Sequence, residues 1–275
     1  MHMSSDDSPL ISVLMGILYK NDDIRLLKRS IDSILNQTYG NIELIICDDG
    51  SSCEARNYVN SCGKLDSRIR IVRGLDRTDL APKLNACLKE SKGEFIARMD
   101  DDDYSMPNRL MVQLNSLLIN PDISFVGSQV SLIENGKSVG VRILPEFPEI
   151  RDFYMTQPFV HPSLLFRREA LLDVEGYSES IRQIRCEDYD LLLRLYAKGH
   201  RGMNLQEPLL EYTLPALDRH KNSNKLMYCW NESYTRFFRF KELNALPETI
   251  PYIIKPLVFG MLPYSLKKWL KKQFQ

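Results

Sequence analysis

Four consecutive aspartates, residues 100–103, are the part of this chain with the clearest potential for chemistry. They follow the apolar residues 95–97 after Arg98 and Met99, and a helical pattern begins soon afterwards at Pro107. Adjacent carboxylates repel one another and an unpaired buried charge is costly, so this acidic run is suited to holding a divalent cation. Oxygen ligands favour Mg²⁺ or Mn²⁺, which retain some waters and bind substrate phosphates. A solvated acidic loop is the alternative, and the strand pattern before the run argues against it.

A second acidic pair, Asp48 and Asp49, follows the apolar residues 42–47 and precedes the flexible turn 50–52. Both acidic clusters therefore stand where a strand ends and a helix is about to begin. In open parallel α/β sheets, ligands bind outside the carboxyl ends of the strands. We therefore expect the two clusters to converge on one cleft.

A third acidic group, Glu187, Asp188 and Asp190, stands at the start of a leucine-rich helical pattern over residues 187–195. The dipole of a helix favours anions in its first turn. On this element alone, the group is either functional or a simple complement to the dipole.

The elements that position these clusters follow from the apolar patterns. Nearly continuous apolar runs predict buried strands, and apolar residues at helical spacing predict the helices between them. The first four strands are expected at residues 10–15, 42–47, 69–72 and 95–99, and later strands at 125–133, 139–143 and 158–166. Strands that alternate with helices predict an α/β fold, a Rossmann-like and mainly parallel sheet flanked by helices.

The composition excludes several classes of protein. Among the 275 residues, 36 Lys and Arg balance 36 Asp and Glu, so no overall field recruits nucleic acid or a membrane. The six cysteines form no C-x-x-C pair, which disfavours zinc. Cys47 and Cys87 lie in apolar patterns, which indicates a reduced, cytoplasmic chain. No apolar run reaches the roughly 18 residues of a spanning helix.

The C-terminal segment combines apolar and basic residues. From Leu266 to Phe274, apolar residues that include Trp269 and Leu270 share one helical face against four lysines. Residues 252–275 are therefore expected either to touch an anionic membrane surface through an interfacial helix or to pack on their own domain. The segment has no recognisable nucleic-acid module, so no nucleic-acid partner is expected.

With these residues placed, the chain resembles the inverting nucleotide-sugar glycosyltransferases of family two, which have the A-type fold. The matching stretches cover roughly residues 10 to 212 in the order found in that family. They are residues 11–15, 33–39, 43–51, 92–103, 107–110, 161–163, 166–168, 176–177 and 187–191.

The resemblance implies roles for individual carboxylates. Asp49, beside Asp48, matches the residue that hydrogen-bonds uracil in such enzymes. Asp100, Asp101 and Asp102 stand at the Asp-X-Asp motif of the donor site. Asp102 is thereby expected to ligate the metal, and Asp100 to contact ribose or a metal-bound water. Because four aspartates occur in a row, Asp103 is the alternative ligand if the register slips by one. Asp188, preceded by Glu187, matches the catalytic base.

Three further positions are assigned more loosely by the resemblance. Lys83 stands where related chains place a loop near the donor and could add positive charge there, or it is an exposed helix lysine. His161 either lines the acceptor side or is a hydrogen-bonded structural residue. Relatives commonly carry Arg and His where this chain has Thr213 and Leu214. His220 is then either a displaced ligand of the metal or diphosphate, or a solvent-exposed histidine.

The implied function is a metal-dependent, inverting transfer of a sugar from a nucleoside diphosphate, with a UDP-sugar expected as donor and Mn²⁺ or Mg²⁺ as cofactor. The acceptor would be a hydroxyl of a glycan or lipid-linked sugar in bacterial surface polysaccharide synthesis, at the inner face of the cell membrane. A disordered lead (1–9), a nucleotide-sugar-binding half (10–105), an acceptor-binding and catalytic half (106–215) and a helical, basic-amphipathic extension (216–275) are expected.

Two alternatives stay open from the sequence. A nucleotidyltransferase also uses carboxylate-bound metal, but it would need a glycine-rich basic loop after the first strand, which residues 16–20 match poorly. A catalytically inactive nucleotide-sugar or glycan-binding domain is the other, and the intact Glu187 and Asp188 pair argues against it.

Overall fold

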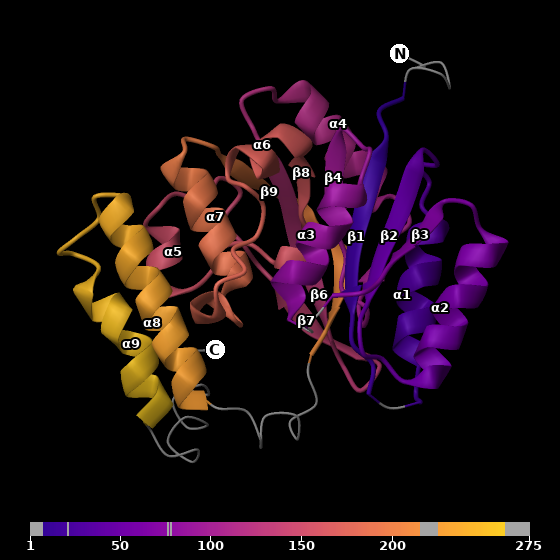
Figure 1. Cartoon of the computed structure of the whole chain (residues 1–275). Helices are drawn as coiled ribbons and strands as arrows, with labels where there is room; N and C mark the ends of the chain where they lie inside the picture. Colours follow the sequence, from indigo (N-terminus) through magenta and orange to yellow (C-terminus); the bar gives the residue numbers. More distant parts are fainter. Residues whose placement is uncertain (1–7, 21, 76, 78, 215–224, 262–275) are drawn as a thin grey trace.

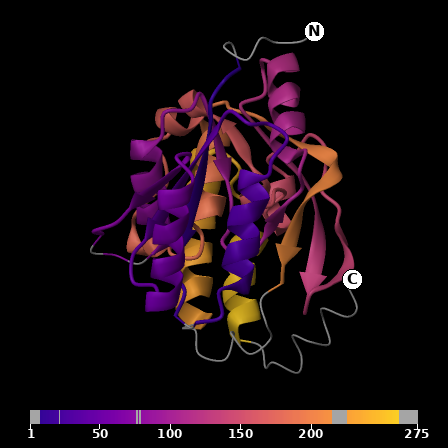
Figure 2. The same cartoon turned by 90° about the vertical axis from the view of Figure 1, so that its right-hand side faces the viewer.

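The computed structural model describes residues 8–20, 22–75, 77, 79–214 and 225–261 (Figure 1). Within these residues, nine strands form one sheet in the order β3-β2-β1-β4-β8-β6-β9-β5, with β7 paired to β6. Helices pack on both faces of the sheet (Figures 1 and 2). This arrangement confirms the α/β fold that the alternating pattern predicted.

The first half of the chain forms the parallel part of the sheet. Its elements are β1 (Ile11–Ile17), α1 (Arg25–Leu35), β2 (Ile42–Asp48), α2 (Cys53–Leu65), β3 (Ile69–Val72), α3 (Leu80–Glu90) and β4 (Phe95–Arg98). β1 pairs in parallel with both β2 and β4, and β2 pairs in parallel with β3. Every residue of β2 is buried, as expected for a strand covered on both faces. The carboxyl ends of β1, β2 and β4 therefore meet at one edge, where the acidic run begins.

The second half extends the same sheet with mixed pairings. Its elements are β5 (Tyr104–Ser105), α4 (Arg109–Ile119), β6 (Phe125–Glu134), β7 (Lys137–Arg142), α5 (Asp152–Met155), β8 (Leu165–Arg167), α6 (Arg168–Asp173), α7 (Glu187–Ala197) and β9 (Gly202–Thr213). β8 is antiparallel to β4 and β6, whereas β6 and β9 are parallel. β5, which directly follows the acidic run, is antiparallel to β9. The two halves thus share one sheet.

Two predictions for the second half had different outcomes. β6 and β7 match the strands expected at residues 125–133 and 139–143 and form a hairpin, whose turn residues Asn135 and Gly136 have φ angles of 51° and 76°. These left-handed values are those that a tight two-residue turn requires. The strand predicted over residues 158–166 is wrong, because the short helix η1 (His161–Ser163) interrupts it and only β8 remains. Pro162 lacks the amide hydrogen of a sheet ladder but suits the first turn of a helix.

Two apolar clusters hold the helices on the faces of the sheet. On one face, α1 and α4 bury Ile31 and Leu114 in a cluster that α2 also joins. On the other face, α3 and α7 bury Leu84 and Leu192 together with residues of α6. The faces of these helices are therefore fixed relative to the carboxyl ends of the strands.

Two further helices, α8 (Lys225–Glu242) and α9 (Ile250–Met261), form the described part of the C-terminal extension. They lie at the opposite end of the molecule from α1 and α2 (Figures 1 and 2). Phe240 of α8 is fully buried, and Nε of Arg239 lies 2.8 Å from Oδ1 of Asp190 on α7. The extension therefore packs on its own domain through α8. Residues 262–275, which hold the lysine-rich pattern, lie outside the described residues.

Candidate active site

The acidic run leaves the sheet at the end of β4, where several contacts hold its backbone. The Tyr19 hydroxyl donates to the carbonyl of Asp101 at 3.1 Å, and the Ser30 hydroxyl donates to the carbonyl of Asp100 at 2.7 Å. Arg98, the last residue of β4, is almost completely buried and forms an ion pair with the Asp100 carboxylate. These contacts therefore anchor the run to the segment after β1, to α1 and to β4.

The four aspartates do not share one environment. Asp100, Asp101 and Asp102 line a cleft, whereas Asp103 is only 1% exposed and accepts a hydrogen bond from the Thr213 amide at 2.7 Å. Burial and the Asp100 charge raise the pKa of Asp103 to about 9. The alternative in which Asp103 serves as the ligand is thus disfavoured, because its carboxyl group faces β9 and not the cleft.

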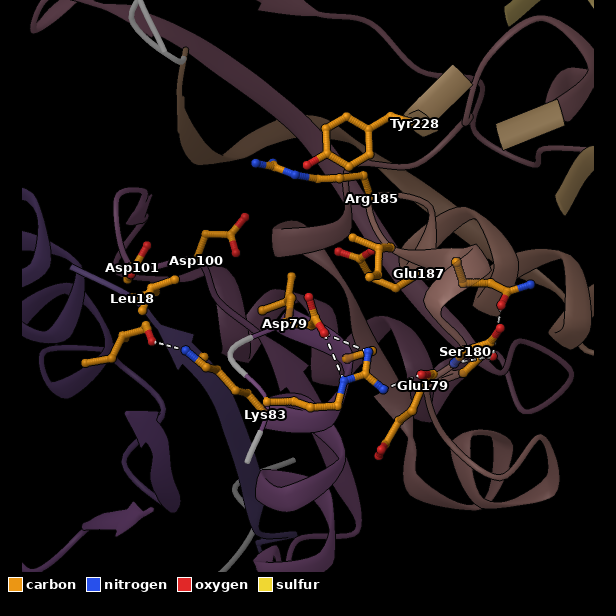
Figure 3. A pocket seen from close by; sticks show the side chains of 18 of the residues that line it. Leu18, Asp79, Lys83, Asp100, Asp101, Glu179, Ser180, Arg185, Glu187 and Tyr228 are labelled. Atoms are coloured by element: carbon orange, nitrogen blue, oxygen red, sulfur yellow. Dashed lines mark hydrogen bonds and ion pairs between the residues drawn. The ribbon is translucent and has the colours of Figure 1, made fainter. Parts of the chain in front are cut away.

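The cleft has a main hollow of about 480 Å³ that the acidic run shares with α3 and with the loop before α7 (Figure 3). A neighbouring hollow of about 330 Å³ contains Asp188 and His161. Leu80, Asp100, Arg185 and Glu187 line both hollows. The two hollows are therefore parts of one cleft, with the acidic run on one side and the start of α7 on the other.

Lys83 of α3 points into this cleft and is only 1% exposed. Its ammonium group, labelled in Figure 3, donates to the carbonyl of Ile17. It also lies 3.4 Å from the carbonyl of Asp49. Burial lowers the pKa of Lys83, and the carboxylates of Asp49, Asp48 and Asp101 oppose that effect. The alternative of an exposed helix lysine is therefore wrong, and the lysine brings a buried positive charge to the carboxyl ends of β1 and β2.

Asp48 and Asp49 do not line the hollows described above. Asp48 is buried, and its Oδ2 lies 3.5 Å from Arg73 and 3.9 Å from Arg56. The Asp48 carboxylate is therefore buried beside these two arginines and lies outside the residues that line the two hollows. Asp49 accepts hydrogen bonds through Oδ1 from the amides of Gly74 at 2.9 Å and Leu75 at 3.3 Å, which hold it beside the loop before α3.

Glu187 and Asp188 begin α7 at the wall opposite the acidic run. Oδ2 of Asp188 accepts a hydrogen bond from Gln157 at 3.1 Å, and burial raises the pKa of Asp188. Burial and the Asp188 charge raise the pKa of Glu187 to about 7. Both carboxyl groups therefore titrate closer to neutrality than ordinary carboxylates, as expected of groups that exchange protons.

The two histidines assigned from the sequence have different outcomes. Nε2 of His161 lies 2.8 Å from the Tyr177 hydroxyl, and burial lowers the pKa of His161 well below its ordinary value. His161 is thus a neutral, hydrogen-bonded residue that also borders the smaller hollow. His220 lies outside the described residues.

Sequence reasoning missed Gln157, Arg185 and Tyr228 as residues of this cleft, and Arg98 as the buried partner of Asp100. A signal existed for Arg98, since an arginine inside an apolar strand directly before four aspartates must find a charge partner when it is buried. Tyr228 comes from α8, so only packing of the extension brings it to the main hollow (Figure 3).

The fit of a metal ion depends on Asp100 and Asp102. Across the described residues, no cluster of three or more His, Cys, Asp or Glu side chains is arranged as a metal site. The oxygen donors suit Mg²⁺ or Mn²⁺, which are commonly held by one or two carboxylates together with substrate phosphates and waters. The residues present therefore fit an ion that enters with a phosphate ligand.

Comparison with known proteins decides the family. The sequence model described as Glycosyl transferase family 2 matches residues 17–174. A Bacillus subtilis (strain 168) protein provisionally named glycosyltransferase EpsE is 33% identical over 270 residues, which are 98% of this chain and 95% of that protein. The chain belongs to glycosyl transferase family 2. Membership makes it a glycosyltransferase and excludes the nucleotidyltransferase alternative.

Other similar proteins match over nearly their whole length. The Escherichia coli O-antigen biosynthesis glycosyltransferase WbnJ is 33% identical over 254 residues, covering 90% of this chain and 97% of that protein. The Escherichia coli UDP-Gal:alpha-D-GlcNAc-diphosphoundecaprenol beta-1,3-galactosyltransferase is 27% identical over 279 residues, covering 98% of each chain.

Solved structures support the A-type fold of family 2. S. aureus TarS 1-349 in complex with UDP-GlcNAc superposes with a TM-score of 0.65 at 16% identity, covering 89% of this chain and 72% of that one. A Pyrobaculum calidifontis mannosyltransferase in complex with GDP-Man and Mn²⁺ gives a TM-score of 0.63 at 16% identity, covering 96% and 79%. Among the described residues, no helix combines the length and apolar character needed to cross a membrane.

Proposed function

We propose that this family 2 enzyme transfers a sugar from a UDP-sugar, with inversion, to a hydroxyl of a glycan or lipid-linked acceptor in bacterial surface polysaccharide synthesis. The observation that carries the proposal is the shared cleft. Glu187 lines the main hollow together with Asp100, Asp102 and Lys83. Asp188 lines the neighbouring hollow, which Asp100 and Glu187 also border. The printed names of the relatives, which include O-antigen synthesis and a diphosphoundecaprenol-linked acceptor, support the same substrate classes.

The proton transfer is assigned to Asp188. A hydroxyl is a poor nucleophile at neutral pH, so a carboxylate within hydrogen-bond reach must accept its proton as the attack on the anomeric carbon develops. Gln157 donates to one oxygen of Asp188 and fixes the direction of the carboxylate. A single displacement of this kind inverts the anomeric configuration.

The donor side of the cleft is assigned to Lys83, Asp49 and the acidic run. Asp49 lies beside the loop before α3 and is expected to contact the base, while Asp100 and Asp101 are expected to contact ribose and phosphate. The buried Lys83 ammonium group supplies a fixed positive charge for the leaving diphosphate. Asp102, assisted by Asp100, would hold Mn²⁺ or Mg²⁺, which when bound neutralises negative charge on the leaving group.

Contact with a membrane surface is part of the proposal. Several large apolar side chains of the C-terminal extension are exposed, namely Leu226, Trp230, Phe237, Phe238, Ile254, Val258 and Met261. The sequence after them carries the lysine-rich pattern of residues 266–274. Apolar side chains next to clustered lysines suit the surface of anionic lipid. We place the enzyme at the cytoplasmic face of the membrane, where lipid-linked acceptors are available.

The test is donor hydrolysis and transfer over a panel of nucleotide sugars, with and without Mn²⁺. We expect one UDP-sugar to be consumed only when the metal is present. In the Asp188→Asn variant, turnover should fall by about 10²- to 10⁴-fold, because the proton acceptor is lost. UDP affinity should stay within about twofold, since the change conserves shape and lies across the cleft from the donor side.

Two outcomes would contradict the proposal. Wild-type turnover in Asp188→Asn would show that another group accepts the proton, with Glu187 as the next candidate. Binding of UDP by the wild type without turnover of any donor would favour the catalytically inactive, nucleotide-sugar-binding alternative.

A further inference from the structure

The C-terminal extension supplies part of the catalytic cleft. Tyr228 of α8 lines the main hollow although α8 follows the catalytic sheet in the chain. Helix α8 is tied to the loop 178–185 by Asn231, whose side chain donates to the carbonyls of Ile181 at 3.3 Å and Ile184 at 3.2 Å. The loop 178–185, which lies beside the proposed base, and helix α8 thus form one wall of the cleft.

Arg185 ends this loop in an unusual conformation. Its φ angle is +70°, a left-handed value that is strained for a residue with a side chain. The guanidinium carbon lies 5.8 Å from the centre of the Tyr228 ring, and Figure 3 shows the two side chains together above Glu187. Strain of this kind persists only where the surrounding structure enforces it, and it concentrates at binding sites.

The cations of the main hollow differ in how they are paired. Arg77 lies 2.6 Å from the Asp79 carboxylate and donates to the carbonyl of Glu179 at 2.6 Å. Lys83 donates to the carbonyls of Ile17 and Asp49. For Arg185, the described part of the chain provides the Tyr228 ring but no ion pair and no hydrogen bond to its guanidinium group. Arg185 is therefore the cation of this hollow that remains available to a ligand.

We infer that Arg185, supported by Tyr228, binds the diphosphate of a lipid-linked acceptor. This inference rests on the proposed function. Arg185 lines both hollows and precedes Glu187 by two residues, so an anion bound there lies beside the proposed base and across the cleft from Lys83. A guanidinium group matches phosphate oxygens in charge and geometry, and stacking on an aromatic ring orients it in advance.

Binding of farnesyl diphosphate tests the inference without knowledge of the acceptor sugar. The protein is first saturated with UDP and Mn²⁺, so that the donor side is occupied, and the probe is then titrated by calorimetry. We expect Arg185→Gln to weaken probe binding by about 10- to 100-fold, because a charge-assisted contact is lost. Tyr228→Leu should weaken it by about two- to fivefold, and Tyr228→Phe should retain it.

Arg182→Gln is the matched control. The Arg182 guanidinium lies 4.7 Å from the Tyr234 ring and so joins the same loop to the same helix, but Arg182 lines neither hollow. We expect this variant to bind the probe like the wild type. An equal loss in Arg182→Gln would show that both changes only loosen α8, which would overturn the inference.

Other results separate failure of the inference from failure of the proposed function. If UDP displaces the probe, or if Arg185→Gln weakens UDP instead of the probe, Arg185 belongs to the donor side and the inference is wrong. Absence of probe binding to the UDP-saturated wild type would also overturn it. If UDP itself does not bind the wild type, the proposed function fails, and titration of the probe alone still decides whether Arg185 binds diphosphate.

Discussion

Residues of identical type acquire different properties in this cleft. Asp100 is paired with the buried Arg98, whereas Asp103 is held by a backbone amide of β9. Burial and the neighbouring Asp102 and Asp100 charges raise the pKa of Asp101 to about 7. Three of the four adjacent carboxylates thus escape mutual repulsion in different ways: Asp100 through the Arg98 cation, Asp103 through a hydrogen bond, and Asp101 through a raised pKa. Asp102 lines the cleft.

The cost of burying the charged form of Glu187 can be tested through its effect on thermal stability. Its folded-state pKa of about 7 lies above the ordinary 4.5, so the charged form is less favourable in the folded than in the unfolded protein. This penalty is absent below the unfolded pKa, grows as pH rises, and is complete above the folded pKa. We expect Glu187→Gln to raise the melting temperature by about 2–4 °C at pH 8, and by much less at pH 5.

Calorimetric melting at the two pH values measures this effect, and Glu207→Gln is the control. Glu207 lies exposed on β9, so its replacement should leave the melting temperature unchanged at both pH values. A gain in Glu187→Gln that is equal at pH 5 and pH 8 would argue for better packing and against relief of a buried charge.

At the scale of single elements, helix α3 places Lys83 in the site by burying it against the sheet. Lys83 lies on the face of α3 that packs on β1 and β2, and its stem lies close to Gly16 of β1. A lysine can be accommodated there because its ammonium group reaches two carbonyls at the strand ends.

Replacement of Lys83 by methionine should weaken UDP binding in the presence of Mn²⁺ by about tenfold, because a fixed charge near the diphosphate is lost. The protein should remain folded, since methionine has a similar unbranched stem and carries no charge to desolvate. Isothermal titration with UDP measures the loss, and Lys89→Met, an exposed change near the end of α3, is the control. Unchanged UDP affinity in Lys83→Met would remove Lys83 from the donor site.

Helices α8 and α9 carry the prediction about the membrane. Trp230 is 59% exposed on α8, and Ile254 is 47% exposed on α9. We expect the wild type to sediment with vesicles that contain phosphatidylglycerol, and Trp230→Gln with Ile254→Gln to reduce the bound fraction several-fold by removing apolar area from the interface. Leu65→Gln is the control, because Leu65 is 88% exposed but lies on α2. Failure of the wild type to bind these vesicles would contradict the prediction.

For the whole molecule, the cleft depends on parts of the chain that are far apart. Asp103 and Thr213 are 110 positions apart, and Asn85 donates at 2.8 Å to the carbonyl of Tyr177, which lies 92 positions further on. The two halves and α8 therefore assemble one site, and a ligand that contacts all of them should stabilise the entire fold.

UDP together with Mn²⁺ should raise the melting temperature of the wild type, because a ligand that binds only the folded state adds about 2.7 kcal/mol of stability at a hundredfold excess over its Kd. EDTA should remove most of this shift. In Asp102→Asn the shift should be reduced, whereas in Asp188→Asn it should persist. An EDTA-insensitive shift would show that UDP binds without the metal.

The sequence by itself determined the order of elements, the positions of the strand ends and the family motifs. These properties depend on local patterns, since a buried strand needs a continuous apolar run and a two-residue turn needs residues such as Asn135 and Gly136. The acidic run and the Glu187 and Asp188 pair were recognised for the same reason, as charged clusters directly beside apolar elements.

Only the tertiary structure decided which side chains share the cleft. It turned Asp48 toward arginines, buried Lys83, directed Asp103 to β9 and brought Tyr228 from the extension to Arg185. Each of these outcomes depends on packing between residues distant in sequence, where the cost of an unpaired buried charge selects the partner. A linear pattern shows which groups carry charge, but the partner that each group finds is a property of the packed chain.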